Sequence, residues 1–206
     1  MDKQVEFFKV SNSNDDEYST CLQIYLQSFP DNERQPTWLI KQRVNNGVAT
    51  LYGGKRDKLT VAMGLLFNLK NSGFLLLDYF AVNAAGRGRG TGALMFDKIV
   101  ALAKKENKQL VLEVEDPDFG ANREERIRRI SFYESKGAAI VPGIQYAQPA
   151  MLEGNEPNEM KLMIVPADPM PSAEEVRLLI IQLYKDLYNK KEEDPLLQKL
   201  LSQFNA

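Results

Sequence analysis

One stretch of sequence decides the fold: it reads LLLDYFAV over residues 75–82 and continues as NAAGRGRGTG over residues 83–92. The first part has the apolar composition of a buried β-strand, and the second part has a glycine at every other position from 86 to 92. A helix is expected to follow, from about Thr91 to Lys105. Glycines let backbone N–H groups approach a ligand, and the first turn of a helix adds unpaired N–H groups at the positive end of the helix dipole. The stretch therefore predicts a phosphate-binding loop between a strand and a helix.

The overall composition narrows the classes of protein that this chain can be. The 206 residues include 26 Lys and Arg against 28 Asp and Glu, which argues against a nucleic-acid partner. No run of about 18 uncharged apolar residues predicts a membrane span, and the charged first residues do not resemble a signal peptide. We therefore expect a cytoplasmic protein with no nucleic-acid or membrane partner. The single cysteine, Cys21, agrees with a reducing compartment.

The chain contains no histidine. This excludes Ser-His-Asp and Cys-His nucleophile systems as well as zinc sites that use histidine, and a single cysteine excludes cysteine-rich zinc sites. We therefore expect no metal. Proton transfer in any reaction would have to use carboxylates, tyrosine, lysine, water or backbone groups.

Hydrophobic periodicity and turn residues predict the order of the elements. A strand is expected over Val5–Val10, and a helix follows with Tyr18, Leu22, Tyr25, Leu26 and Phe29 on one face. The further elements are a helix over Trp38–Val44, a hairpin of Ala49–Tyr52 and Leu59–Leu66 with its turn at Gly53–Asp57, a strand over Phe74–Val82, the helix after the glycine loop, a strand over Leu110–Glu115, a helix over Asn122–Ser135 that stops at Gly137, and a strand pair, Ala138–Val141 and Glu159–Ile164, around a long loop at Pro142–Asn158.

The composition changes at Pro166, so we predict two domains, 1–165 and 166–206. The second begins with a proline-rich linker, and Ser172 has the character of a helix N-cap. Two apolar stripes follow in this segment, one of Val176, Ile180, Leu183 and Leu187, the other of Leu196, Leu197, Leu200, Leu201 and Phe204. These helices are expected to pack on their own domain. If a stripe were exposed, it would indicate a homodimer contact.

Two well-known phosphate-binding motifs do not account for the glycine loop. Residues 88–93 satisfy the GxGxxG/A pattern of dinucleotide-binding folds, and Glu113 lies at a plausible distance downstream. A dinucleotide fold, however, would continue with more parallel strands and crossover helices, which this sequence does not predict. A Walker P-loop is excluded because no Gly-Lys-Ser/Thr follows the glycines.

The pattern Arg/Gln-x-x-Gly-x-Gly/Ala fits better, here as Arg87-Gly88-Arg89-Gly90-Thr91-Gly92 after a strand ending Phe80-Ala81-Val82. A second motif, SFYESKG over residues 131–137, follows. Together with the element order over Val5–Val165, these motifs resemble the GNAT superfamily of N-acetyltransferases. The resemblance implies an α/β (α+β) fold with a mixed, mostly antiparallel sheet flanked by helices. In that fold two central parallel strands, here Phe74–Val82 and Leu110–Glu115, splay apart, and a C-terminal helical extension would follow.

The resemblance also implies acetyl-CoA as the co-substrate. Pantetheine would bond to the backbone of Phe80, Ala81 and Val82. The diphosphate would lie on the amides of the loop, which are those of Arg87, Gly88, Arg89, Gly90, Thr91 and Gly92. Backbone donors hold phosphates without requiring particular side chains.

The reaction implied is direct transfer of the acetyl group to a primary amine. By its position in the second motif, Tyr133 would protonate the departing thiolate; the alternative is that it only packs beside Phe132. Asp78, a carboxylate inside an apolar strand, is the expected base, with a structural hydrogen bond as its alternative role. Further candidates for the base are Glu33, Glu113 and Glu115. Two residues depart from the family pattern, since Arg126 replaces an asparagine and Ala138 replaces a phenylalanine.

Acidic residues gather where the family's acceptor would enter, and Glu33, Glu115 and Tyr146 are the predicted acceptor-binding residues. A negative entrance favours a small cationic amine such as a polyamine, an aminoglycoside or a lysine side chain. Two other functions stay open: a catalytically silent acyl-CoA-sensing module, and an interaction protein that uses the C-terminal helices.

Overall fold

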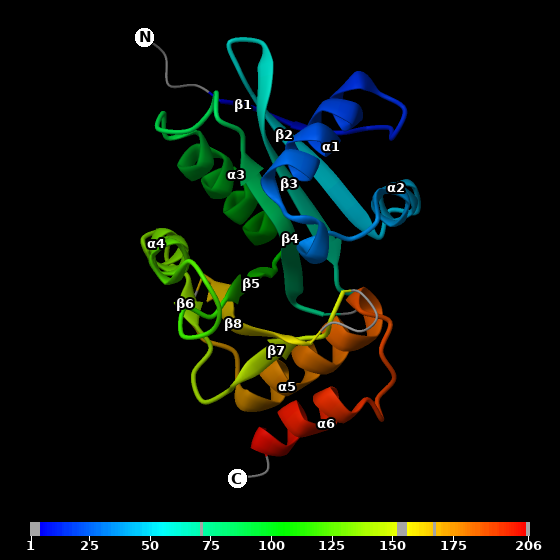
Figure 1. Cartoon of the computed structure of the whole chain (residues 1–206), viewed down its shortest axis with the longest axis vertical. Coiled ribbons are helices and arrows are strands. Elements are labelled where there is room, and N and C mark those ends of the chain that lie inside the picture. The colour runs from blue at the N-terminus through cyan, green and yellow to red at the C-terminus, as the bar shows by residue number, and fades with distance from the viewer. Residues whose placement is uncertain (1–4, 71, 152–155, 167, 205–206) are drawn as a thin grey trace. The chain divides into compact units, whose positions relative to one another are not determined.

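The apolar strand β4 (Phe74–Val82) has residues in two structural units of the computed structural model (Figure 1). The first unit contains the chain up to Asn68 and Leu76–Glu106, and the second contains Leu69–Leu75 and the chain from Asn107 onward. The structure describes residues 5–70, 72–151, 156–166 and 168–204.

The first unit is a sheet with helices packed on it. Its strands lie in the order β1-β2-β3-β4. β1 pairs antiparallel with β2, and β2 with β3, in a register that places Leu51 opposite Leu65. The helices α1 and α3 contact β3. The elements of this unit are β1 (Glu6–Lys9), α1 (Asp16–Ser28), the 3-10 turn η1 (Asp31–Glu33), α2 (Thr37–Asn45), β2 (Ala49–Arg56), β3 (Leu59–Asn68), the main part of β4 and α3 (Thr91–Lys105).

The hairpin between β2 and β3 is longer than the sequence predicts. The expected turn at Gly53–Asp57 is wrong, because Gly53 and Gly54 lie inside β2. The turn is made by Asp57 and Lys58, whose φ angles of 51° and 67° are those of a two-residue hairpin turn. Gly53 serves packing instead, since an added Cβ would overlap the ring of Phe8.

The buried face of α1 also differs from the predicted one. Tyr18 and Tyr25 are buried as expected, but Leu26 is 42% exposed. Cys21 and Ile24 complete the buried face instead. The face is rotated toward them because α1 packs on β3 and β2 along that side.

The second unit is arranged around β8. β8 pairs antiparallel with β5, β6 and β7, with Glu113 opposite Leu162 and Ala147 opposite Glu159. The amide of Gln109 donates to the carbonyl of Gly73 at 2.8 Å, so β4 and β5 begin side by side. The elements are the start of β4, β5 (Gln109–Glu115), α4 (Arg123–Glu134), β6 (Ala139–Ile140), β7 (Tyr146–Gln148), β8 (Asn158–Val165), α5 (Ala173–Gln182), the π-helical turn η2 (Leu183–Leu187), α6 (Pro195–Leu201) and the 3-10 turn η3 (Ser202–Phe204).

The predicted fold class is confirmed: the sheet is mixed, mostly antiparallel, with one parallel pair, β4 and β5, and helices flank it. That the parallel pair splays apart stays a prediction. One detail of the second unit is wrong, because the expected loop at Pro142–Asn158 contains β7, paired to β8. Residues 152–155 of that loop lie outside the described residues.

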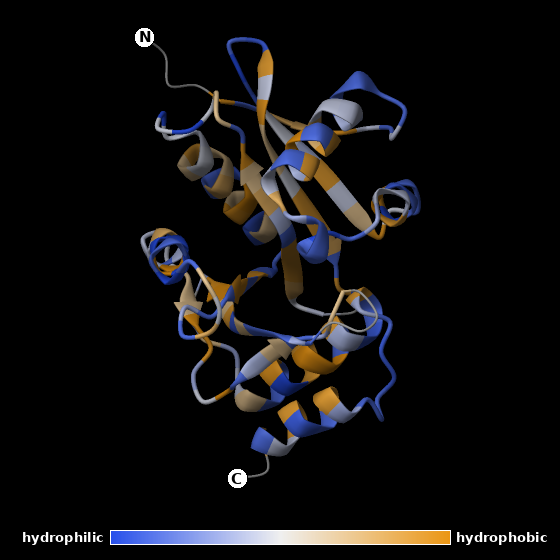
Figure 2. Cartoon of the chain, in the orientation of Figure 1, coloured by the Kyte–Doolittle hydropathy of each residue, from blue (hydrophilic) through white to orange (hydrophobic). Residues whose placement is uncertain are grey.

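The C-terminal helices pack on their own unit, as predicted. Val176, Ile180, Leu183 and Leu187 are buried, and so are Leu197, Leu200 and Leu201. Figure 2 shows that α5 and α6 each carry both hydrophobic and hydrophilic residues. The predicted N-cap at Ser172 is confirmed, and it forms a capping box: its hydroxyl accepts from the amide of Glu175 and its own amide donates to the Glu175 carboxylate at 2.8 Å. The division into domains 1–165 and 166–206 stays a prediction.

Within the described ranges, no helix combines the length and the apolar character that a membrane span requires.

Candidate active site

The loop after β4 is fixed at its start by Asn83. The Asn83 amide donates to the carbonyl of Val61 at 2.9 Å, which ties the loop to β3. The Asn83 carbonyl accepts from the amides of Gly86 and Arg87 at 3.0 and 3.2 Å. Its side-chain oxygen accepts from Gly86 as well, at 3.1 Å. The loop is therefore a defined turn rather than a loose connection.

The glycines of the loop have different physical roles. Gly88 and Gly90 have φ angles of 70° and 74°, in the left-handed region that favours glycine, and nothing lies within 4 Å of an added Cβ. At Gly86 the constraint is space, because an added Cβ would lie 2.8 Å from Val82 Cγ1 and 3.0 Å from Val61 Cβ. Backbone conformation at two positions and packing at a third thus set the shape of the loop.

The result is a row of unused donors at the start of α3. Leu94 is the first amide of the helix to find an acceptor, the carbonyl of Gly90 at 3.0 Å. In the part of the chain that the structure describes, the amides of residues 88–93 donate to no acceptor. The Thr91 hydroxyl is buried and has no hydrogen-bond partner either. Such a cluster of donors at a helix N-terminus suits an anion such as a phosphate.

The two arginines of the loop lie at its exposed surface. Arg87 Nε donates to the carbonyl of Val82 at 3.0 Å, which holds the side chain against the end of β4. Arg89 Nη1 lies 3.5 Å from the carboxylate of Asp57, and Arg56 donates to the Arg89 carbonyl at 3.1 Å. Both guanidinium groups add positive charge beside the row of amides.

The strand that leads into the loop carries Phe80, Ala81 and Val82. The Phe80 ring is partly exposed and meets the ring of Phe96 on α3, with centroids 6.0 Å apart. Ala81 is buried, and Val82 is partly exposed. These three residues therefore lie between the sheet core and the loop, where the family resemblance expects backbone contacts to pantetheine.

Asp78 belongs to a polar network in the first unit. The side-chain amide of the buried Gln35 donates to Asp78 Oδ2 at 3.3 Å, and Arg43 donates to the oxygen of the same amide. The Tyr79 hydroxyl accepts from the backbone amide of Gln35 at 3.1 Å and donates to the backbone carbonyl of Glu33 at 2.9 Å. Gln35 and Tyr79 thus link the predicted residue Asp78 to the backbone of the predicted residue Glu33. Sequence analysis missed Gln35, whose position before a proline gave no signal of burial.

Tyr133 lies in the last turn of α4, in the second unit. The helix ends as predicted, with Gly137 at a φ of 84° and the amide of Ala138 bonded to the Tyr133 carbonyl at 3.1 Å. The side chain is buried, and its ring meets that of Phe132 edge to face. Burial raises the pKa of Tyr133 to about 12, while the charge of Arg129 acts in the opposite direction. The phenol therefore carries its proton at neutral pH.

Glu115, predicted to bind the acceptor, is held by two arginines. Arg126 and Arg129 each place a guanidinium nitrogen 2.7 Å from its carboxylate. Arg126 also donates to the carbonyl of Asp116 at 3.0 Å. The departure from the family's asparagine at residue 126 therefore has a structural role, because this arginine ties α4 to the end of β5.

Glu113 is held by tyrosines instead. Tyr188, which directly follows η2, donates to Glu113 Oε2 at 2.6 Å, and the predicted residue Tyr146 donates to Oε1. Gln148 donates to the Tyr188 hydroxyl at 2.8 Å, and Tyr184 donates to the Ala147 carbonyl at 2.5 Å. Burial raises the pKa of Glu113, and the two phenol hydrogen bonds act against that rise. Sequence analysis missed Tyr188, although its helical spacing from Tyr184 could have signalled a shared face.

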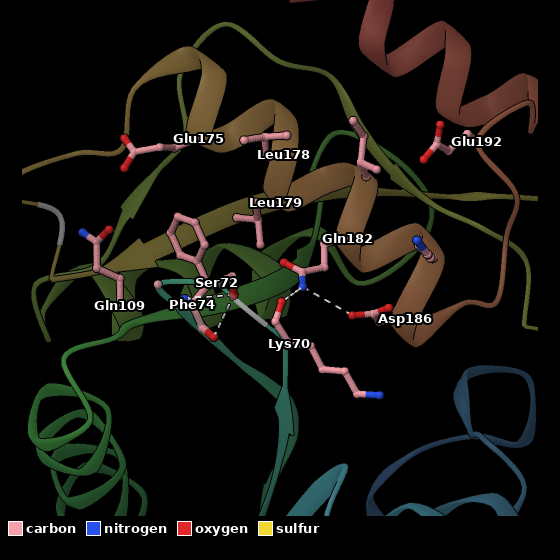
Figure 3. Close-up of a pocket in the computed structure, with 13 residues that line it drawn as sticks. Lys70, Ser72, Phe74, Gln109, Glu175, Leu178, Leu179, Gln182, Asp186 and Glu192 are labelled. Atoms are coloured by element: carbon pink, nitrogen blue, oxygen red, sulfur yellow. Dashed lines mark hydrogen bonds between the residues drawn. The ribbon is translucent and has the colours of Figure 1, made fainter.

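The second unit also contains a pocket of about 690 Å³ between the start of β4 and α5 (Figure 3). Phe74, Leu178 and Leu179 form part of its lining. Three of its polar residues bond to each other, since the Gln182 side-chain amide donates to the Lys70 carbonyl and to Asp186. None of the predicted site residues lines this pocket.

The described residues contain no group of three side chains that could hold a metal ion. Cys21 is buried in α1, and burial raises the pKa of its thiol to about 12.

Comparison with solved structures identifies the class of fold. The chain has the fold of the GNAT acetyltransferases. A structure described as "Putative acetyltransferase from GNAT family from Bacteroides thetaiotaomicron" matches with a TM-score of 0.78 and 23% identity, over 90% of this chain and 99% of that one. Residues 1–165 are 80% of the 206 residues, so the match extends into the C-terminal segment.

Two more distant structures share the fold. A GNAT family acetyltransferase from Elizabethkingia anophelis, solved with acetyl-CoA bound, has a TM-score of 0.53 and 14% identity over 78% of this chain and 96% of that one. The ribosomal-protein-S18-alanine N-acetyltransferase from Escherichia coli has a TM-score of 0.55 and 14% identity, over 79% of this chain and 94% of that one.

A curated relative is similar in sequence. The "Putative acetyltransferase YjbC" of Bacillus subtilis (strain 168) is 31% identical over 120 residues. The match spans 58% of this chain and 58% of the relative's length. No protein-family model matches the chain.

Proposed function

We propose that this chain is an acetyl-CoA-dependent N-acetyltransferase that moves the acetyl group directly to a primary amine on a small cationic acceptor. The observation that carries the proposal is the row of amides at residues 88–93, which have no acceptor in the described part of the chain and lead into the N-terminus of α3. The acetyl-CoA in the Elizabethkingia anophelis structure and the acetyltransferase named in Bacillus subtilis support this choice of ligand and reaction.

Two groups of residues would hold acetyl-CoA. The diphosphate would accept from the amides of residues 88–92, with the Arg87 and Arg89 side chains supplying charge; the Arg87 amide, also predicted to bind the diphosphate, instead donates to the Asn83 carbonyl. The pantetheine amides would pair with the backbone of residues 80–82 at the end of β4. Acetyl-CoA supplies the activated thioester, and the protein supplies orientation and proton transfer.

The chemistry requires one proton to leave the acceptor and one to reach the thiolate. The amine nitrogen forms a bond to the thioester carbonyl carbon, and the carbon–sulfur bond breaks. We assign proton donation to the thiolate to the Tyr133 hydroxyl, on the basis of its position in the second motif; the phenol is protonated at neutral pH. The proton of the acceptor goes to Asp78, which Gln35 orients with a hydrogen bond of 3.3 Å.

The assignment of Tyr133 is tested by Tyr133→Phe, with thiol release from acetyl-CoA as the assay. Loss of the proton donor should lower kcat more than tenfold, since positioned acids contribute roughly 100- to 10,000-fold, while the Kd for acetyl-CoA stays unchanged. Tyr18→Phe is the control, because Tyr18 is buried as Tyr133 is, and its hydroxyl has no partner among the described groups. Unchanged turnover in Tyr133→Phe would remove the assignment.

The acceptor is tested by measuring thiol release across polyamines, aminoglycosides, amino acids and peptides. A cationic amine should be the best substrate. Acetyl-CoA binding without release for any acceptor would favour the silent sensing module instead. The third function, an interaction protein built on the C-terminal helices, has less support, because both apolar stripes are largely buried within the second unit. A homodimer and a cytoplasmic location stay predictions.

A further inference from the structure

Three carboxylates, those of Glu113, Glu115 and Asp116, lie in the last part of β5 and directly after it, and each has different partners in the structure. Glu115 lies 2.7 Å from both Arg126 and Arg129. Asp116 is buried and lies 2.6 Å from the ammonium group of Lys161. Glu113 has no cationic partner within the described part of the chain. Of the three, Glu113 alone lacks a compensating charge from the described residues.

The surroundings of Glu113 are those of a binding group rather than of a surface carboxylate. Its two oxygens accept from the hydroxyls of Tyr146 and Tyr188, so both are fixed in position. Tyr188 is itself held by Gln148 at 2.8 Å and meets the ring of Tyr184 with centroids 6.0 Å apart. Removing a carboxylate from water without a counter-charge is costly, and a cationic ligand would offset that cost.

Glu113 and Tyr188 are each partly exposed as residues, whereas Tyr146 is buried. Phenol rings around a carboxylate suit an ammonium ion in two ways. The carboxylate accepts its hydrogen bonds, and the faces of the rings attract a positive charge.

We propose that Glu113, with the hydroxyls of Tyr146 and Tyr188 on its two oxygens, binds an ammonium group of the acceptor amine. This inference rests on the proposed function and adds the location of the acceptor's charge. It also gives the segment after Pro166 a direct role, because Tyr188 comes from that segment and contacts the binding carboxylate. The C-terminal segment then completes the acceptor site rather than serving only as an extension.

The test is calorimetric titration of the full-length protein with spermidine and with n-butylamine, using 1-butanol as the uncharged match to n-butylamine. Glu113→Gln should weaken spermidine binding by about 10- to 100-fold, because it removes a charged hydrogen-bond acceptor. Tyr188→Phe should weaken binding about three- to tenfold, since one oxygen of Glu113 loses its donor. 1-Butanol should bind to none of the proteins.

Two control variants separate recognition from structure. Tyr184→Phe removes a hydroxyl from the same turn that donates to Ala147 and not to Glu113. Glu174→Gln removes an exposed carboxylate on α5 that pairs with Arg177. Both should bind spermidine within twofold of the wild-type protein, and thermal melting of each variant reports whether it is folded.

Three results would overturn the inference: a wild-type protein that binds neither amine, a Glu113→Gln variant that binds spermidine as the wild type does, or equal losses in Tyr184→Phe and Tyr188→Phe. Acetyl-CoA is titrated separately into the same proteins. Failure to bind acetyl-CoA would remove the proposed function and leave the amine titrations as an independent result. An amine site unaffected by Glu113→Gln, in a protein that binds acetyl-CoA and releases thiol, would remove only this inference.

Discussion

Gly90→Ala tests whether the backbone of the glycine loop, rather than its side chains, binds acetyl-CoA. Gly90 is the residue directly before α3 and has a φ of 74°. An added Cβ would meet nothing within 4 Å, so the substitution introduces no clash. Its only effect is to disfavour the left-handed conformation that directs the neighbouring amides.

The size of the effect follows from that conformation. In the left-handed region, a residue with a Cβ is destabilised by about 1–2 kcal/mol. Alanine also lowers the conformational entropy of the unfolded chain, which stabilises the folded protein by about 0.4–1 kcal/mol. The free energy of unfolding should therefore fall by only about 1 kcal/mol. If the loop relaxes to a negative φ, acetyl-CoA must restore the original conformation on binding. Its Kd should then rise about 5- to 30-fold.

The assay is isothermal titration of acetyl-CoA, with melting temperatures measured alongside. Gly47→Ala is the matched control for strain, since Gly47 has a φ of 69°, open space around it, and a position at the end of α2. Gly47→Ala should keep the wild-type Kd and lose stability.

The reasoning is refuted if Gly90→Ala binds acetyl-CoA within twofold of the wild type while its melting temperature falls as far as that of Gly47→Ala. That pair of results would mean that the left-handed residue stabilises the fold but does not shape a binding site.

Three further predictions concern other parts of the chain. Ser172→Ala should lower the free energy of unfolding by about 1 kcal/mol in urea titration, because it removes the capping box of α5, and Ser172→Asp should retain most of the stability. Asp78→Asn should abolish the acidic limb of the pH profile of kcat/KM, and an intact limb would exclude Asp78 as the base. Burial raises the pKa of Glu113 above its ordinary value of 4.5. The protonated group therefore stabilises the folded protein below pH 4.5, and this stabilisation is lost as the pH rises through the pKa of the group in the folded protein. Glutamine does not titrate, so the melting temperature of Glu113→Gln minus that of the wild type should rise between pH 4 and pH 7, and a difference that stays constant would contradict the shift.

Local sequence was sufficient to predict most of the elements because their periodicity and end signals agree. The helix after the glycine loop was predicted over Thr91–Lys105 and is found there. The end of α4 at Gly137 and the N-cap at Ser172 were also predicted correctly, because each depends on residues a few positions apart. The hairpin turn failed for the opposite reason. Gly53 looks like a turn residue, yet it is glycine because Phe8, 45 positions earlier, packs on it.

The candidate site also shows that local sequence predicts local features and misses partners that are distant in the sequence. The loop is a local feature, and its two left-handed glycines occupy positions that the motif identifies. The partners of the carboxylates are not local. Gln35 meets Asp78 from 43 residues away, and Tyr188 meets Glu113 from 75 residues away. Nothing near Glu113 in the sequence distinguishes it from Glu115, although the fold gives one of them tyrosines and the other arginines.

That difference changes which acidic residue should recognise the acceptor. Sequence analysis assigned the acceptor's charge to Glu33 and Glu115 because they are acidic and lie where the family's acceptor would enter. A carboxylate already bonded to two guanidinium groups attracts a further cation weakly, because its charge is largely compensated. The carboxylate of Glu113 is held by two phenols and has no cationic partner among the described residues that would compensate its charge. Within β5, the choice between binding group and structural ion pair therefore depends on the partners that α4, β7 and the C-terminal segment bring to each carboxylate.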